Sequence, residues 1–260
     1  MDSTGIDSAV EALLAPIASA VSAIVFYAVP IGDSELPLIV LWLAAAALYF
    51  TIYLRFINFR ALWLAIRHVR GDFSDPEAQG EISHLKAVAT AVSGTVGVGN
   101  IGGVAVAISM GGPGATFWLL VAGVLSMSTK LVECTLGVKY RRQNADGSVS
   151  GGPMYYLEHW FQRKNWPRVG RLMGGFYALA LVIAGFGIGN MFQANQAYTQ
   201  FLVITGGEHS WLNERGWFFG LALATVVALV IIGGIRSIAR VTVLLVPFMA
   251  GLYIVSALAV

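Results

Sequence analysis

The sequence predicts an all-α integral membrane protein. Hydrophobic residues make up 57% of the 260 residues and charged residues only 12%, which is about half the charged share of a typical soluble domain. A soluble domain of this length would need more polar residues to cover its surface. The high hydrophobicity also excludes a disordered chain, and the single cysteine excludes a disulfide scaffold.

Long stretches without Asp, Glu, Lys or Arg define the expected membrane spans. A transmembrane helix needs about 20 apolar residues, and the uncharged stretches supply six such helices. The longest stretch, from Ala87 to Thr129, holds two of them, because Gly111-Gly112-Pro113-Gly114 predicts a turn between helices. The expected spans are residues 37–56, 84–109, 115–138, 174–203, 217–235 and 241–260.

Residues 12–32 form a further uncharged stretch whose large apolar side chains recur on one helical face. A helix of this kind lies flat at the membrane interface, and we prefer this interpretation to a seventh span. The head of the chain is acidic and lacks the basic region of a secretory signal peptide. We therefore expect an N-terminal interfacial amphipathic helix within residues 1–36.

Lys and Arg gather on one side of this six-span arrangement. Fourteen of the 16 basic residues fall in the connections after the first, third and fifth spans or, for Arg55 and Lys86, at the span ends that flank them; Lys130 lies deeper inside a span, and Arg215 lies on the opposite side. The positive-inside rule places the basic connections in the cytoplasm. We therefore expect a multi-pass protein of the cell membrane with an extracytoplasmic, periplasmic N-terminus.

A glycine-rich run from Ser93 to Asn100 falls in the middle of the second span. Gly97–Gly102 matches the dinucleotide fingerprint G-x-G-x-x-G, but no acidic residue occurs between Glu81 and Glu133, so a nucleotide site is rejected. The glycines weaken a helix, and freed backbone groups at membrane depth must line a cavity or face protein. The run is either a close helix contact through small residues or a broken helix that binds a carboxylate and a cation. Asn100 favours the broken helix.

A second glycine-rich run, Gly185–Gln193, introduces amide side chains into the fourth span. Gly189, Gln193, Gln196 and Gln200 recur at helical spacing on one face. Amides at membrane depth need hydrogen-bond partners. They either join helices or form a polar wall that faces a substrate, and the sequence leaves both hypotheses open.

The connection after the third span combines aromatic and basic residues. It opens with Gly151–Tyr156 and continues with Trp160, Phe161 and Trp166 among Lys and Arg side chains. This composition indicates an interfacial helix with a structural role.

Nothing in the sequence indicates catalysis. The four histidines are scattered without an H-E-x-x-H pattern, and G-x-S-x-G is absent. The basic residues lie in loops that flank the membrane, which explains them without a nucleic acid. We therefore expect no enzyme, no organic cofactor and no nucleic-acid partner; the lipid bilayer is the expected surrounding.

Several motifs together resemble the alanine/glycine:cation symporter family, also called sodium:alanine symporters. They occur in collinear order over roughly residues 40–255. The motifs are Glu81–His84, Thr95–Ala105, Gly111–Ala115, Lys139–Arg141, Gly151–Glu158, Phe186–Met191, Gly233–Ile238 and Val246–Ala250. The resemblance implies a LeuT-type transporter fold with two inverted five-helix repeats. Residues 37–57 would then be the leading transmembrane helix and residues 84–260 the first repeat.

The resemblance also implies a function and its site: sodium-coupled symport of a small neutral amino acid, alanine or glycine, into the cell. It places the amino acid against the backbone around Thr95, Gly97, Val98 and Gly99 and the side chain of Gln193. It places sodium near the carbonyls of Ser93 and Val96 and the side chain of Asn100. Sodium would be co-transported.

Family members carry a second repeat, which supplies the far side of both sites. The chain is therefore expected to hold only the leading helix and the first repeat, and not to transport alone. Two alternatives remain open. One is a membrane channel with a glycine-rich filter, which would show a flux that does not saturate. The other is a non-transporting membrane protein built from a single repeat.

Overall fold

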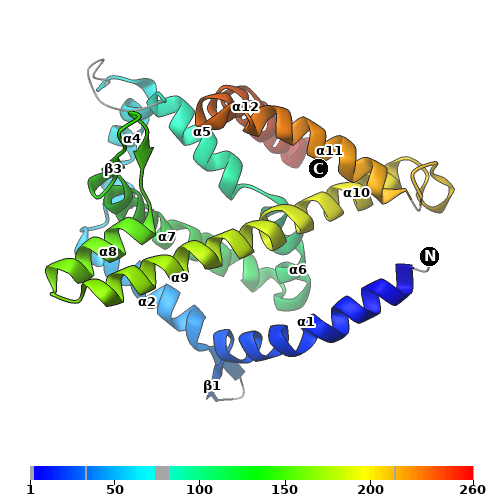
Figure 1. Ribbon diagram of the computed structural model, residues 1–260, viewed down its shortest axis with the longest axis horizontal. Coiled ribbons are helices and arrows are strands. Elements are labelled where there is room, and N and C mark those ends of the chain that lie inside the picture. The colour runs from blue at the N-terminus through cyan, green and yellow to red at the C-terminus, as the bar shows by residue number, and fades with distance from the viewer. Residues whose placement is uncertain (1–2, 33, 74–81, 214, 260) are drawn as a thin grey trace. The chain divides into compact units, whose positions relative to one another are not determined.

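The computed structural model describes residues 3–32, 34–73, 82–213 and 215–259, which are mainly helical (Figure 1). The chain divides into two compact units. One comprises Met1–Arg60 with Trp118–Val132, and the other comprises Ala61–Phe117 with Glu133–Val260.

The first unit begins with α1 (Ser3–Val25), which is followed by two short antiparallel strands, β1 (Ala28–Ile31) and β2 (Ser34–Pro37). The sequence predicts an interfacial helix within residues 1–36, whereas the structure ends the helix at Val25 and continues as this hairpin. Gly32 enters the turn with a φ of 64°, a conformation that favours glycine.

Small polar side chains join α2 (Leu38–Tyr53) to α7 (Pro113–Lys139) in the same unit. Thr51, which is 1% exposed, donates to the carbonyl of Ala47 at 2.8 Å and lies 3.2 Å from the hydroxyl of the fully buried Ser128. In the short helix α3 (Ile57–Arg60), the side-chain amide of Asn58 donates a hydrogen bond to the carbonyl of Val124 at 3.0 Å. Small residues and interhelical hydrogen bonds are how helices associate in lipid, where apolar surface alone gives no driving force.

The second unit contains the remaining elements in chain order. They are α4 (Leu62–Arg70), α5 (His84–Thr95), η1 (Val98–Asn100), α6 (Gly102–Gly111), the end of α7, the paired strands β3 (Arg142–Gln143) and β4 (Val149–Ser150), α8 (Pro153–Arg163), α9 (Pro167–Phe186), the π-helical turn η2 (Gly187–Met191), α10 (Phe192–Ile204), η3 (Gly207–His209), α11 (Gly216–Ile231) and α12 (Gly234–Ala259). Within this unit α5 lies along α12, and α8 lies along α9 (Figure 1).

Close contacts fix both of these helix pairs. Ala89 of α5 and Ala239 of α12 are buried, and the hydroxyls of Thr90 and Thr242 lie 3.2 Å apart across the pair. In the other pair, a Cβ on Gly170 would lie 2.9 Å from Cβ of Phe161, so only glycine allows α9 to approach α8 this closely. The first pair anchors the helix that precedes the glycine-rich run.

The loop between β3 and β4 is closed by one carboxylate. Asp146 accepts hydrogen bonds from the amide of Ser148 at 2.9 Å and from its hydroxyl at 2.6 Å. These bonds favour the ionised form, so they lower the pKa of Asp146 below its ordinary value. The loop therefore carries a fixed negative charge at neutral pH.

Three helices among the described residues are long and apolar enough to cross a membrane: Pro113–Lys139, Pro167–Ile204 and Gly234–Ala259. The bent pair His84–Thr95 and Val98–Gly111 would make a fourth. The sequence predicts six spans; α2 and α11 are apolar but have only 16 residues each, which is about 24 Å of helix against a hydrocarbon core of about 30 Å. α11 stops early because Gly233 and Gly234 follow it, and Gly234 has a φ of 68°.

Candidate functional site

The glycine-rich run breaks a helix. The axes of α5 and α6 meet at an angle of 72°. The amide of Val96 donates to the carbonyl of Val92 and closes the last turn of α5. Val96 and Gly97 then take extended conformations before η1 begins at Val98. The sequence left close packing and a broken helix open; the structure shows the broken helix.

The amides after the break bond to side chains instead of to the preceding turn. Gly97 N donates to Oδ1 of Asn100, and Val98 N donates to Oε1 of Gln193, each at 3.0 Å. In a continuous helix these two amides would donate to the carbonyls of Ser93 and Gly94. The carbonyls of Ser93 and Gly94 therefore lack their usual helical donors. Backbone carbonyls before the break and backbone amides after it are thus left without helical hydrogen bonds.

Gln193 reaches the break from a different part of the chain. It lies in the first turn of α10, directly after the π-helical turn η2, and such turns are frequent at functional sites. A Cβ on Gly97 would lie only 2.9 Å from Nε2 of Gln193. The extended backbone of Gly97 suits any residue, so the effect of a larger residue here would be to displace the amide group of Gln193.

Two hollows meet at this contact. The smaller, of about 670 Å³, lies between the α5–α6 break and α12. The larger, of about 1110 Å³, lies between α10 and α11. Val98 and Gln193 line both hollows, so the hydrogen bond between them forms part of the wall that the two hollows share.

The structure brings together five of the eight site residues expected from the sequence. The five that line the smaller hollow are Val96, Gly97, Val98, Asn100 and Gln193. The other three, Ser93, Thr95 and Gly99, are not among its lining residues. The hydroxyls of Ser93 and Thr95 donate to carbonyls of their own helix, Thr90 at 2.7 Å and Ala91 at 2.9 Å. Their hydroxyl hydrogens are therefore engaged within α5, and the part of these residues that the sequence places near a ligand is the backbone.

The amide face of α10 is divided in its role. Gly189 and Gln193 line the larger hollow, together with Asn190. Nε2 of Gln196 instead donates a hydrogen bond to Oδ1 of Asn195 at 3.4 Å. Gln200 lines neither hollow. The sequence left open whether these amides join helices or form a polar wall that faces a substrate. Gln193 has a feature of each, because it makes an interhelical hydrogen bond and also lines a hollow.

Residues of α12 that the sequence did not indicate also line the site. Met249, Tyr253 and Ser256 line the smaller hollow opposite the break. Tyr253 and Ser256 are three residues apart in an otherwise apolar stretch, the same signal that identified Gln193. The contact of α12 with α5 turns these polar groups into part of the site.

A broken apolar helix with uncommitted amides and carbonyls beside a hollow is the arrangement by which helical membrane transporters hold solutes and cations. Comparison with known proteins gives the family. The chain belongs to the sodium:alanine symporter family, whose model matches residues 22–260.

Named relatives agree with this assignment. The chain is 36% identical over 224 residues to the sodium/alanine symporter AgcS of Methanococcus maripaludis, covering 86% of this chain and 47% of that protein. It is 33% identical over 217 residues to the probable sodium/glutamine symporter GlnT of Bacillus subtilis, covering 84% of this chain and 42% of that protein. The chain therefore spans somewhat less than half the length of these relatives.

Proposed function

We propose that this chain provides amino-acid and sodium sites of a sodium-coupled symporter that carries a small neutral amino acid, alanine or glycine, into the cell across the cell membrane. One observation carries the proposal: the amide of Val98, freed by the break between α5 and α6, is held by Gln193 at the edge of a hollow. Family membership supports this class of solute and ion, since the relatives' names include sodium, alanine and glutamine.

The amino acid binds through its carboxylate. In the structure Oε1 of Gln193 accepts from Val98 N at 3.0 Å, and a carboxylate oxygen is an acceptor of the same kind. The substrate carboxylate takes over this amide, and the side-chain NH₂ of Gln193 then donates to the carboxylate. Gln193 thus satisfies a membrane-buried amide when the site is empty and contacts the substrate when the site is filled.

Sodium binds beside the carboxylate through oxygen ligands of the unwound segment. The carbonyl of Ser93 has lost its helical donor, and Val96 and Asn100 line the hollow. Oδ1 of Asn100 accepts from Gly97 N at 3.0 Å and keeps a second lone pair for a cation. The carboxylate and sodium therefore share one stretch of backbone, which couples the binding of one to the other.

A small solute fits this site. The backbone nearest the break is glycine at Gly94, Gly97 and Gly99, and a Cβ on Gly94 or Gly99 would meet no atom within 4 Å. The remaining lining is mainly apolar, with Met249 and Tyr253 from α12. Such a surface suits an amino acid whose side chain is a methyl group or a hydrogen better than one whose side chain is charged.

Uptake by the complete natural gene product tests this proposal. Reconstituted in proteoliposomes, the protein is expected to take up labelled alanine along an inward sodium gradient, with a rate that saturates as alanine rises. Replacing sodium with choline is expected to abolish the uptake. Equal uptake in choline would contradict the sodium assignment, and a rate linear in alanine would indicate a channel.

A further inference from the structure

An exposed group of basic side chains surrounds the turn between α8 and α9. We call Arg163, Lys164, Arg168 and Arg171 the basic corner; all four residues are exposed. The chain has no Asp or Glu between Glu158 and Glu208, so Glu158 is the acidic residue nearest to them in the sequence.

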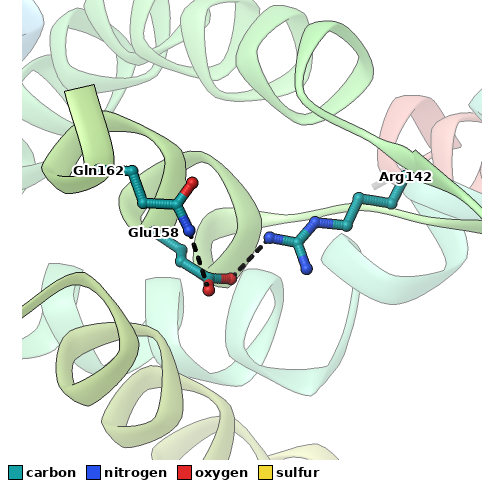
Figure 2. A network of polar contacts seen from close by, with 3 residues as sticks. All are labelled: Arg142, Glu158 and Gln162. Carbon is teal, nitrogen blue, oxygen red and sulfur yellow. Dashed lines mark hydrogen bonds and ion pairs between the residues drawn. The ribbon is translucent and has the colours of Figure 1, made fainter. Parts of the chain in front are cut away.

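The only acidic residue of α8 is already engaged. Glu158 forms an ion pair with Arg142 of β3 at 2.8 Å and accepts a hydrogen bond from Gln162 at 3.3 Å (Figure 2). Within the part of the chain that the structure describes, none of the four basic-corner side chains takes part in an ion pair. The corner therefore presents four positive charges to its surroundings.

Tryptophans accompany these charges. Trp160 and Trp166 are 53% and 61% exposed, and Nζ of Lys164 lies 5.9 Å from the ring centre of Trp160. An open hollow of about 530 Å³ at the turn is lined by Asn165, Trp166, Pro167, Arg168 and Val169. Exposed Trp beside Lys and Arg is the composition of the membrane–water interface.

The position of the corner on α9 sets its depth in a membrane. α9 begins the apolar stretch Pro167–Ile204, and its glycine face, Gly170 and Gly174, is buried against α8. Elsewhere on α9, Leu172 and Phe176 are 73% and 67% exposed. The change from Arg to exposed apolar residues occurs within one helical turn, which puts the guanidinium groups at the level of lipid headgroups.

We propose that the basic corner binds the phosphate of an anionic phospholipid headgroup. Charge complementarity selects this occupant: a zwitterionic lipid brings no net negative charge, and a second copy of this surface would bring four more positive charges. The predicted positive-inside orientation places the corner at the cytoplasmic leaflet, whose surface is negatively charged. Arg168 and Arg171 hold the phosphate, and the two tryptophans lie at the glycerol level.

Native mass spectrometry of the full chain in detergent tests this proposal, with phosphatidylglycerol or phosphatidylcholine titrated in. The wild-type chain is expected to bind phosphatidylglycerol preferentially. The variant Arg168→Gln/Arg171→Gln is expected to weaken that binding roughly thirty-fold, about fivefold for each cation at the headgroup level. The variant Arg168→Lys/Arg171→Lys keeps the charge and is expected to retain most of the binding.

The matched control is Arg60→Gln/Arg70→Gln, which removes two exposed arginines elsewhere and is expected to leave the binding unchanged. Equal loss in the control would overturn the proposal, as would equal binding of the two lipids or failure of the lysine variant to bind. Displacement of phosphatidylglycerol by an equal concentration of inorganic phosphate would also overturn it, because the site would then be a free-anion site. This readout is independent of transport, so its failure leaves the proposed function untouched.

Discussion

Replacing Gln193 with glutamate is expected to lower sodium-dependent alanine uptake by at least about 100-fold, because a hydrogen bond to a charged group is lost and a like charge takes its place. The glutamate side chain has nearly the same shape as glutamine, and it would still accept from Val98 N, from which Gln193 accepts at 3.0 Å. The fold should therefore persist. A glutamate cannot donate to the substrate carboxylate, however, and it repels it. Initial rates of labelled alanine uptake measure the effect.

Two further variants separate the roles of this side chain. Gln193→Leu removes both the acceptor and the donor, and it is expected to be less damaging than Gln193→Glu, because it adds no repulsion. Gln200→Glu places the same charge on the same helix at a position that lines neither hollow, and it is expected to retain uptake. If Gln193→Glu transported as well as the wild type, Gln193 would only cap the amide and would not touch the substrate.

Replacing Gly97 with alanine is expected to raise the KM for alanine about tenfold, equivalent to about 1.4 kcal/mol of binding. The new Cβ would lie 2.9 Å from Nε2 and 3.2 Å from Oε1 of Gln193, so the flexible end of that side chain must move. Its hydrogen bond to Val98 N would be lost. The backbone at Gly97 has φ −140°, which alanine adopts without strain, so the variant should fold.

The control for Gly97→Ala is Gly99→Ala, two residues along the same segment. A Cβ there would meet no atom within 4 Å, so the KM is expected to stay within a factor of about two. The effect of Gly97→Ala should also shrink in a Gln193→Leu background, since the two residues act through one contact. Equal effects of the two glycine substitutions would mean that backbone flexibility, and not the position of Gln193, determines affinity.

Local composition located the break in the second span without deciding it. The three glycines allowed either close helix packing or a broken helix, Asn100 at the end of the run favoured the break, and the structure shows Asn100 accepting from Gly97 N. Spacing alone also selected Gln193 as a polar residue at membrane depth. The break depends on interactions within a few residues, and Gln193 is noticeable because a polar side chain occurs in an apolar stretch. Both features can be seen directly in a sequence.

Features that depend on distant contacts were beyond the sequence. Tyr253 and Ser256 join the site only because α12 lies against α5, where the hydroxyls of Thr90 and Thr242 meet. No local signal tells which helix lies opposite a break. The choice between interhelical bonding and a substrate-facing wall for Gln193 also depended on where Val98 would be placed.

Element ends were the least predictable part of the fold. Residues 26–32 read as the tail of an uncharged stretch, yet Ala28–Ile31 form a strand there, β1, which pairs with β2 (Ser34–Pro37). The helix that holds the fourth expected span, residues 174–203, begins earlier, at Pro167, and Gly170 and Gly174 pack its first turns onto α8. The charges of Arg168 and Arg171 led to the prediction of a connection there, but both residues lie on the exposed side of this helix.

Protection of single cysteines by substrate tests most directly whether the amino acid and sodium bind at the helix break. Cys134 is the one cysteine of the 260 residues, so its replacement by alanine, together with any cysteine outside these residues, gives a background without thiols. Ser256→Cys then places a thiol in the smaller hollow, and Ile232→Cys places one in the larger hollow. Alanine with sodium is expected to slow labelling of Ser256→Cys by a thiol reagent, alanine with choline is not, and Ile232→Cys should be unaffected. Protection that needs no sodium, or that appears at Ile232→Cys and not at Ser256→Cys, would contradict the account.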